Sequence, residues 1–245
     1  MAIDYTKRGG SSAPGPDVSA PIASAPDEAA PVAAPGAAPI SLSKVTLTKA
    51  SPSISLSKRG AATGMLRVNL NWNARPAGGG GFLKRLTEPS IDLDLGALYE
   101  FTDGSKGVVQ ALGNAFTSAQ SFTSSPVVRL DGDDRSGTSS GGENLFVDLT
   151  FTPQIKRILV FASIYSGVRN WAAADGVVTL YPVGSAPIEV RLDEAEAGSP
   201  ICAIAMLENV GGDLEVRREV RYVQGSQSVL DTTYGWGMSW TPGRK

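Results

Sequence analysis

The sequence LRVNLNWN, residues 66–73, alternates apolar side chains with arginine or asparagine side chains over its whole length. Successive side chains of an extended strand point to opposite faces, so this period of two predicts a strand with one buried and one solvated face. The same period is found through most of the chain that follows, and no segment has a long amphipathic helical period. The predicted fold class is therefore all-β, an antiparallel β-sandwich.

Further strands are predicted where period-two segments are bounded by turn residues such as Asp103-Gly104 and Gly211-Gly212. The pentapeptide ISLSK occurs at 40–44 and again at 54–58, and each copy predicts a short additional strand. Short helical turns are expected around Gln227–Asp231 and near Thr152–Ile155. The remaining strands are expected at 91–102, 107–112, 145–149, 155–165, 176–183, 187–192, 200–208 and 213–223.

The domain organisation follows from composition. The chain has 245 residues, of which 42% are hydrophobic, enough for one main domain. Residues 13–39 contain 10 Ala and 7 Pro and no aromatic residue. Such a segment buries too little apolar surface to offset its loss of conformational entropy. We therefore predict a disordered Ala/Pro-rich tail and linker over residues 1–39 and a β-sandwich domain over residues 40–245.

Several classes of function are excluded by residue usage. The chain has no histidine, which excludes Ser-His-Asp and Cys-His catalysis and every histidine-containing metal site. Cys202 is the single cysteine and lies in an apolar segment, where a buried packing role is expected. The net charge of −2 argues against generic nucleic-acid binding, and no apolar segment approaches the length of a membrane-spanning helix. A protein of the cytoplasm, without direct membrane insertion, is predicted.

The acidic residues form the strongest candidate site. In the segment IDLDL, Asp92 and Asp94 share one face of a predicted strand. A second segment, 130–144, adds four acidic residues and four glycines, which let a loop direct several oxygens to one centre. Hard oxygen ligands on a flexible loop suit calcium, although the EF-hand spacing is missing. A solvated hairpin loop is the alternative, since Asp and Gly are common turn residues.

Other motifs have simpler interpretations. The glycines of Gly78–Gly81 lack the Lys-Ser/Thr ending of a phosphate-binding loop. The segment 215–222 predicts a charge ladder on one strand face. Arg218 falls on the apolar face and is expected either to lie at an edge or to pair with a partly buried acid, Asp92 or Asp94 being candidates. Trp236 and Trp240 are expected to share one strand face and cover an end of the core.

Several of these motifs together resemble a known family. They are Asp92–Tyr99 (DLDLGALY), Gly107–Asn114 (GVVQALGN), Leu130–Arg135 (LDGDDR), Lys156–Phe161 (KRILVF) and Gly235–Gly237 (GWG). This combination resembles the TerD-domain family of tellurium-resistance proteins, specifically its TerA-like branch. The resemblance covers about residues 40–240.

The resemblance implies a cytoplasmic, non-enzymatic calcium-binding β-sandwich of bacterial tellurite-resistance and stress-response systems. It implies work with other products of the same operon, including a TerC-type membrane protein that would hold the chain peripherally at the inner face of the membrane. Calcium, as one or two ions, would lie between the Asp-Leu-Asp strand and the acidic loop. Gly141-Gly142 stands where the family has two aspartates, so weaker binding is expected. The ligands carried over by this match are Asp92, Asp94, Asp133, Asp134 and Glu143.

Three hypotheses of function remain open from the sequence. In the first, calcium orders the acidic loops into a surface that docks partner proteins. In the second, the chain is a metal-independent interaction scaffold that uses a sheet edge or the Arg217–Arg221 strand face. In the third, paired carboxylates serve a hydrolase. Nothing in the sequence indicates the oligomeric state.

Overall fold

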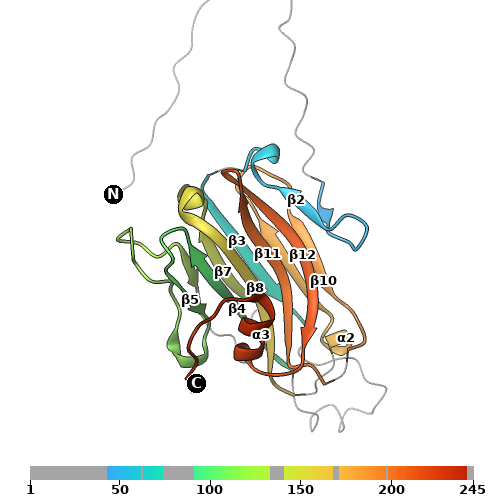
Figure 1. The fold of residues 1–245 in the computed structure, drawn as a ribbon. Coiled ribbons are helices and arrows are strands. Elements are labelled where there is room, and N and C mark those ends of the chain that lie inside the picture. The colour runs from blue at the N-terminus through green and yellow to red at the C-terminus, as the bar shows by residue number, and fades with distance from the viewer. Residues whose placement is uncertain are drawn as a thin grey trace, which may run out of the picture. The chain divides into compact units, whose positions relative to one another are not determined.

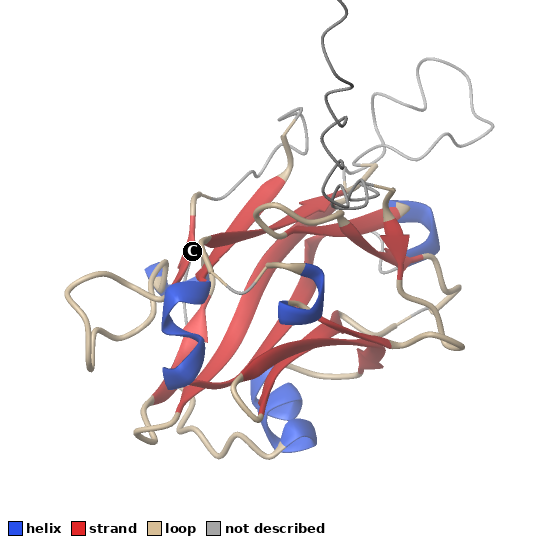
Figure 2. Cartoon of the chain, turned by 90° about the horizontal axis from the view of Figure 1, so that it is seen from above, coloured by secondary structure: helices blue, strands red, loops and turns tan. Residues whose placement is uncertain are grey.

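The structure is a computed structural model that describes residues 43–61, 63–73, 91–132, 141–167, 171–196 and 198–241. All of them belong to the unit Ile40–Lys245, so the predicted tail over residues 1–39 lies outside the described residues. The strands form two layers (Figures 1 and 2). The two-sheet, all-β architecture expected from the period-two pattern is confirmed.

The first sheet has six strands in the order β1-β10-β9-β3-β7-β6. All neighbours are antiparallel except β1 and β10, which run parallel. The segment LRVNLNWN lies at its centre, where β3 pairs with β9 on one side and with β7 on the other. The strands are β1 (Val45–Thr46), β3 (Met65–Asn71), β6 (Val128–Leu130), β7 (Glu143–Asp148), β9 (Gly176–Tyr181) and β10 (Ile188–Leu192).

The second sheet also has six strands, in the order β2-β12-β11-β8-β4-β5, and all neighbours are antiparallel. A β-bulge interrupts the pairing of β11 between Ala203 and Ala205, and Val220 of β12 opposite it has a φ of 39°. The strands are β2 (Ser53–Ser55), β4 (Asp92–Phe101), β5 (Lys106–Val109), β8 (Ile155–Ser166), β11 (Ile201–Val210) and β12 (Asp213–Val223).

The two sheets differ in how their outer faces are covered. In β7 and β9, buried residues alternate with partly exposed ones, so the outer face of the first sheet meets solvent. In β4, all ten residues are buried. Its outward-facing Leu98 joins a second apolar cluster with Phe161 of β8 and with Leu230 and Trp236 of the C-terminal segment. The helix α3 (Gln227–Tyr234) and the segment after it therefore cover the outer face of the second sheet (Figure 1).

Several predicted elements have different bounds in the structure. The turn expected around Gln227–Asp231 is confirmed as α3, and the one near Thr152–Ile155 is a 3-10 helix over Leu149–Gln154. The two other 3-10 helices, Ser57–Arg59 and Leu112–Asn114, occupy the ends of predicted strands. The three-residue strand β6 and the short helix α2 (Trp171–Ala174) were not predicted.

The expected strand containing Trp236 and Trp240 is wrong. Gly235 and Gly237 have φ values of 62° and 70°, and this left-handed backbone interrupts the extended chain. Trp236 nevertheless covers apolar surface, because it is buried in the second cluster. No helix of the described residues is long and apolar enough to cross a membrane.

Candidate functional site

Asp92 and Asp94 lie on β4, where they pair in register with Ser166 and Ser163 of β8. Each is 6% exposed, although the strand-forming pattern alone would allow a solvated face. Two residues apart on one strand, their Cα atoms are about 6.6–7 Å apart. Bringing two carboxylates this close in a buried position requires compensating positive charge or hydrogen bonds.

Glu143 is the first residue of β7 rather than part of the glycine-rich loop in which the sequence analysis placed it. Its side chain is buried at 2% exposure, and its Oε2 accepts a hydrogen bond of 2.6 Å from the backbone N–H of Leu95. This hydrogen bond joins the first sheet to the second, and its donor, Leu95, directly follows Asp94 in the chain. Three of the five predicted ligands are therefore buried acids near the same stretch of β4.

The other two predicted ligands, Asp133 and Asp134, lie outside the described residues. Within the part of the chain that the structure describes, no group of three or more His, Cys, Asp or Glu side chains is placed to hold a metal ion. Asp92, Asp94 and Glu143 are all described and do not form such a group by themselves, so the five-residue ligand set stays a prediction. The donors that are described are carboxylate oxygens only, a set that favours a hard cation such as calcium over a transition metal.

Gly142 has a conformation that excludes an aspartate. Its φ is 62°, and a Cβ built there would lie 2.1 Å from the carbonyl oxygen of Leu70. The glycine that stands in place of an acidic residue is therefore required by the backbone path into β7. No acidic ligand can be supplied from this position without moving β3 or the loop.

A network of neutral amides holds the start of β7. Asn69 Nδ2 donates to the carbonyl of Gly141 and, at 2.9 Å, to Asn144 Oδ1. Asp131 accepts from the backbone N–H of Asn144 at 3.2 Å and from its Nδ2 at 2.9 Å. Asp131 thus holds the chain just after β6 to the start of β7. Asn69 was not predicted as a site residue, because its only signal was its place on the polar face of LRVNLNWN.

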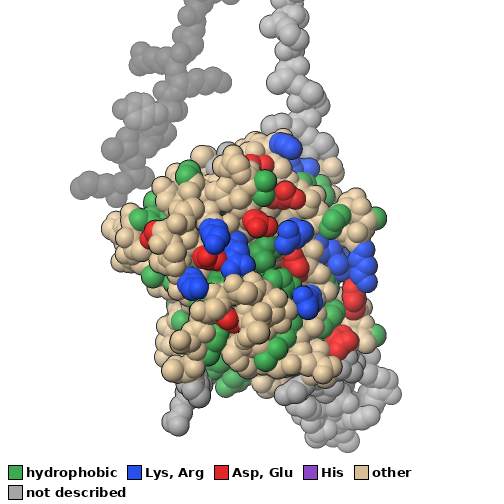
Figure 3. Space-filling model, in the orientation of Figure 1, with side chains coloured by type: hydrophobic (Ala, Val, Ile, Leu, Met, Phe, Trp, Pro, Cys, Tyr) green, Lys and Arg blue, Asp and Glu red, His purple; other side chains and the backbone are tan. Residues whose placement is uncertain are grey.

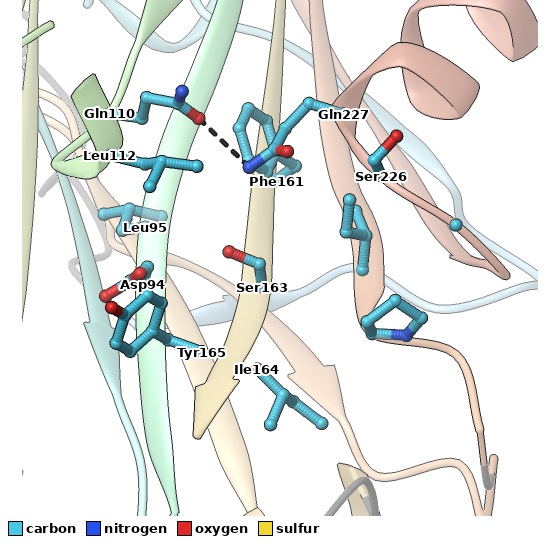
Figure 4. Close-up of a pocket in the computed structure, with 13 residues that line it drawn as sticks. Asp94, Leu95, Gln110, Leu112, Phe161, Ser163, Ile164, Tyr165, Ser226 and Gln227 are labelled. Carbon is cyan, nitrogen blue, oxygen red and sulfur yellow. Dashed lines mark hydrogen bonds between the residues drawn. The ribbon is translucent and has the colours of Figure 1, made fainter. Parts of the chain in front are cut away.

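Asp94 also lines a cavity of about 180 Å³ on the outer face of the second sheet (Figure 4). Gln227 Nε2 donates to Gln110 Oε1 at 3.3 Å across it, joining the start of α3 to the end of β5. A larger cavity of about 610 Å³ shares both glutamines and extends to Trp240. The described lining is composed of neutral amide, hydroxyl and apolar groups with Asp94 as its one charged residue.

Charged side chains hold the C-terminal segment, α3 and the residues after it, which lines one side of these cavities. Buried Asp231 of α3 accepts hydrogen bonds of 3.0 Å from the backbone N–H groups of Gly237 and Met238. Arg157 of β8 donates to the carbonyls of Tyr234 and Gly235, and its guanidinium lies 3.8 Å from the centre of the Trp236 ring. These contacts close the helix end and seat Trp236 on the sheet.

Glu100 supports this arrangement from β4. It bonds Lys156 at 2.7 Å and Arg157 at 2.6 Å. Burial raises the pKa of Glu100, but the hydrogen bonds from these two cations outweigh it, and the pKa lies below its ordinary value. The carboxylate is therefore ionised and holds Arg157 under Trp236.

The expected partner of Arg218 is wrong. Arg218 Nη2 lies 3.5 Å from Glu194 Oε1, in the connection between β10 and β11, and not beside Asp92 or Asp94. Cys202 is fully buried as expected, and burial raises the pKa of its thiol well above the ordinary value. A protonated, inaccessible thiol is a poor nucleophile and a poor metal ligand.

Comparison with known proteins gives one close relative. No family model matches the chain. A crystal structure of a protein of unknown function has a TM-score of 0.49 and 15% identity, covering 69% of this chain and 95% of that one. The crystal structure of a homologue of telluride resistance protein (TerD) from Streptomyces coelicolor A3(2) has a TM-score of 0.48 and 20% identity, covering 71% of this chain and 98% of that one.

The sequence relative is "Tellurium resistance protein TerA" from Alcaligenes sp, which is 46% identical over 208 residues, or 84% of this chain. The match spans 60% of the relative's own length. Identity at this level over most of the chain reflects common descent, and it confirms the resemblance that the motifs indicated. Over the matched residues, this chain is a relative of a tellurium-resistance protein, TerA.

Proposed function

We propose that this chain is a non-enzymatic, calcium-binding β-sandwich protein of a bacterial tellurite-resistance and stress-response system. It acts in the cytoplasm by docking protein partners through loops that the ion orders. The partners are other tellurite-resistance operon proteins, including a TerC-type membrane protein that brings the chain to the inner face of the membrane. The observation that carries the proposal is the 46% identity to TerA, which is named as a resistance protein and not as an enzyme.

The burial of the acids supports the calcium part of the proposal. Asp92 and Asp94 on β4 and Glu143 on β7 are between 2% and 6% exposed, and Glu143 reaches β4 through its hydrogen bond with the backbone N–H of Leu95. These three described acids do not by themselves form a group placed to hold a metal ion. A divalent cation would neutralise these carboxylates and draw the acidic loop, with Asp133 and Asp134, toward them. With Gly142 unable to carry an acid, one weakly held ion is the expected stoichiometry.

Thermal melts of the full chain in chelator, magnesium and calcium test the site. Calcium at a hundredfold excess over its dissociation constant stabilises the folded state by about 2.7 kcal/mol, which is easily measured as a shift in Tm. We expect a calcium-selective shift that is lost in Asp92→Asn/Asp94→Asn and retained in Glu208→Gln, a matched change of an exposed carboxylate on β11. An equal shift in both variants would refute the assigned ligands.

The docking part needs its own measurement. Affinity capture of the other operon products on the full chain is expected in calcium and not in chelator, and Asp92→Asn/Asp94→Asn is expected to abolish it. Capture that is unchanged by chelator would support the metal-independent scaffold instead. A melt that shows calcium binding together with capture that ignores calcium would separate the two parts of the proposal.

A further inference from the structure

The outer face of the first sheet carries a row of alternating aromatic and arginine side chains. Tyr181 of β9, Arg67 of β3, Phe146 of β7 and Arg129 of β6 are directly opposite one another in register. The residues that flank each arginine are buried in the core, so both arginines point outward. All four side chains are half-buried, as expected for groups lying flat on a sheet.

The rings fix the orientation of the two arginines. The guanidinium carbon of Arg67 lies 4.1 Å from the centre of the Tyr181 ring, and that of Arg129 lies 4.2 Å from the centre of the Phe146 ring. Arg67 donates one hydrogen bond, to Asn144 Oδ1 at 3.2 Å. Among the described residues, no carboxylate forms an ion pair with either arginine. Stacking thus restrains both cations, and within the described part of the chain most of their N–H groups have no hydrogen-bond partner.

The arginines on the outer face of the second sheet have different partners. Arg217 bonds Glu219 at 2.9 Å and Arg157 bonds Glu100 at 2.6 Å, while Arg221 lies over Tyr234 of α3. Figure 3 shows basic and acidic side chains interspersed over this side of the molecule. On the Arg217–Arg221 strand face, which the sequence offered for an interaction, Arg217 is therefore paired with carboxylates and Arg221 packs over a ring. Within the described residues, the two ring-stacked arginines of the first sheet, on the opposite side, have no carboxylate partner.

We infer that the row formed by Arg67 and Arg129 docks an acidic segment of a partner protein. The two arginines are two strands apart, about 9.5 Å. This spacing matches carboxylates three residues apart in a polyproline II segment, which has three residues per turn and rises about 3.1 Å per residue. Asp131, just after β6, and Asp148, the last residue of β7, lie two positions along the chain from Arg129 and Phe146, and the whole chain has a net charge of −2. Two arginines flanked by acidic side chains, on a chain with net negative charge, attract a ligand with a few separate carboxylates. The acidic side chains and the net charge repel the continuous negative charge of a nucleic acid or a lipid surface.

The binding of a fluorescein-labelled oligoglutamate peptide to the full chain, in chelator, tests this inference. We expect salt-sensitive binding that Arg67→Gln/Arg129→Gln weakens by about tenfold or more. Arg217→Gln/Arg221→Gln removes the same charge from the second sheet and is the matched control. It should leave the affinity within about twofold. Equal loss in the two variants, or no binding by the unchanged chain, would overturn the inference.

Two further arms keep the result interpretable. Arg67→Lys/Arg129→Lys retains the charges but loses the flat, forked donors, so an affinity between those of the unchanged chain and the glutamine variant is expected. Melting temperatures verify that each variant is folded. Tighter binding of oligothymidylate or of anionic phosphatidylserine vesicles than of oligoglutamate, lost in the glutamine variant, would assign the row to phosphates and overturn the proposed partner. Because chelator is present, failure here is distinct from failure of the calcium proposal.

Discussion

At the scale of single residues, the backbone conformation of Gly142 explains why this position carries no acidic side chain. A replacement by aspartate would add a carboxylate to the acidic segment, but its Cβ would meet the carbonyl oxygen of Leu70 at 2.1 Å with φ at 62°. We predict that Gly142→Asp lowers the free energy of unfolding by about 2 kcal/mol or more and does not tighten calcium binding. Gly132→Ala, with an open surrounding, should cost little. Urea denaturation with and without calcium measures both effects, and a stabilised, tighter-binding Gly142→Asp would contradict the prediction.

Glu100 gives a second prediction at this scale, through its dependence on pH. Its pKa in the folded chain lies below the ordinary 4.5, because hydrogen bonds from Lys156 and Arg157 outweigh the effect of burial. A depressed pKa contributes stability that is complete above the ordinary value and is lost as the pH falls through the folded value. Glu100→Gln should therefore lose stability at pH 7 and show a smaller further loss below pH 4.5. Denaturation from pH 7 to pH 3 checks this, and parallel curves for variant and parent would disprove it.

The sequence predicted some of these residues because their geometry is local. Asp92 and Asp94 share a face by the period of a strand, and Cys202 is buried because its neighbours are apolar. The hydrogen bond from Leu95 to Glu143 and the ion pair of Arg218 with Glu194 join strands and loops far apart in the chain. Such contacts depend on how the two sheets and their loops pack against each other. The alternation of residues within one strand carries no information about that packing.

At the scale of elements, the C-terminal segment depends on one carboxylate. Asp231 accepts from two backbone N–H groups and turns the chain back over the second sheet. We predict that Asp231→Ala lowers the free energy of unfolding by about 1–3 kcal/mol, because both donors lose their buried acceptor. Amide exchange in Gly235–Trp240 should accelerate more than exchange in β8. Thr232→Ala, an exposed change in the same helix, is the control, and equal acceleration in both variants would show that Asp231 does not fix the segment.

The elements that the sequence predicted well are the long strands. Strand β12 has the predicted bounds 213–223, and β4 differs from its prediction by one residue at each end. The three residues of β6 carry too little periodicity to be detected. In Trp236–Trp240, the alternation of large and small residues predicted a strand, but the left-handed conformation of the neighbouring glycines prevents one. Alternation predicts a strand only where the backbone stays extended.

At the scale of the whole molecule, the two sheets are unlike, and the sequence already contained the signal. Residues 201–207 are continuously apolar, which is typical of a strand buried on both faces, whereas β7 and β9 alternate. This asymmetry leaves the first sheet open for the arginine row and gives the second a closed outer cluster. Asp94 lies on the second sheet and Glu143 on the first, and the hydrogen bond from Leu95 to Glu143 is a joint between them that a metal ion bound by both acids would strengthen.

That joint gives a prediction that separates a structural role of Glu143 from a metal-binding one. Glu143→Gln keeps an oxygen that can accept from the Leu95 N–H but removes the charge, whereas Glu143→Ala removes both. In chelator, we expect Glu143→Gln to stay within about 1 kcal/mol of the parent and Glu143→Ala to lose about 1–3 kcal/mol more. In calcium, both variants should lose the stabilising shift, because a neutral amide is a poorer ligand than a carboxylate. A full calcium shift in Glu143→Gln would leave the carboxylate a purely structural link between the sheets. Its loss, with stability in chelator preserved, would make the same side chain both link and ligand.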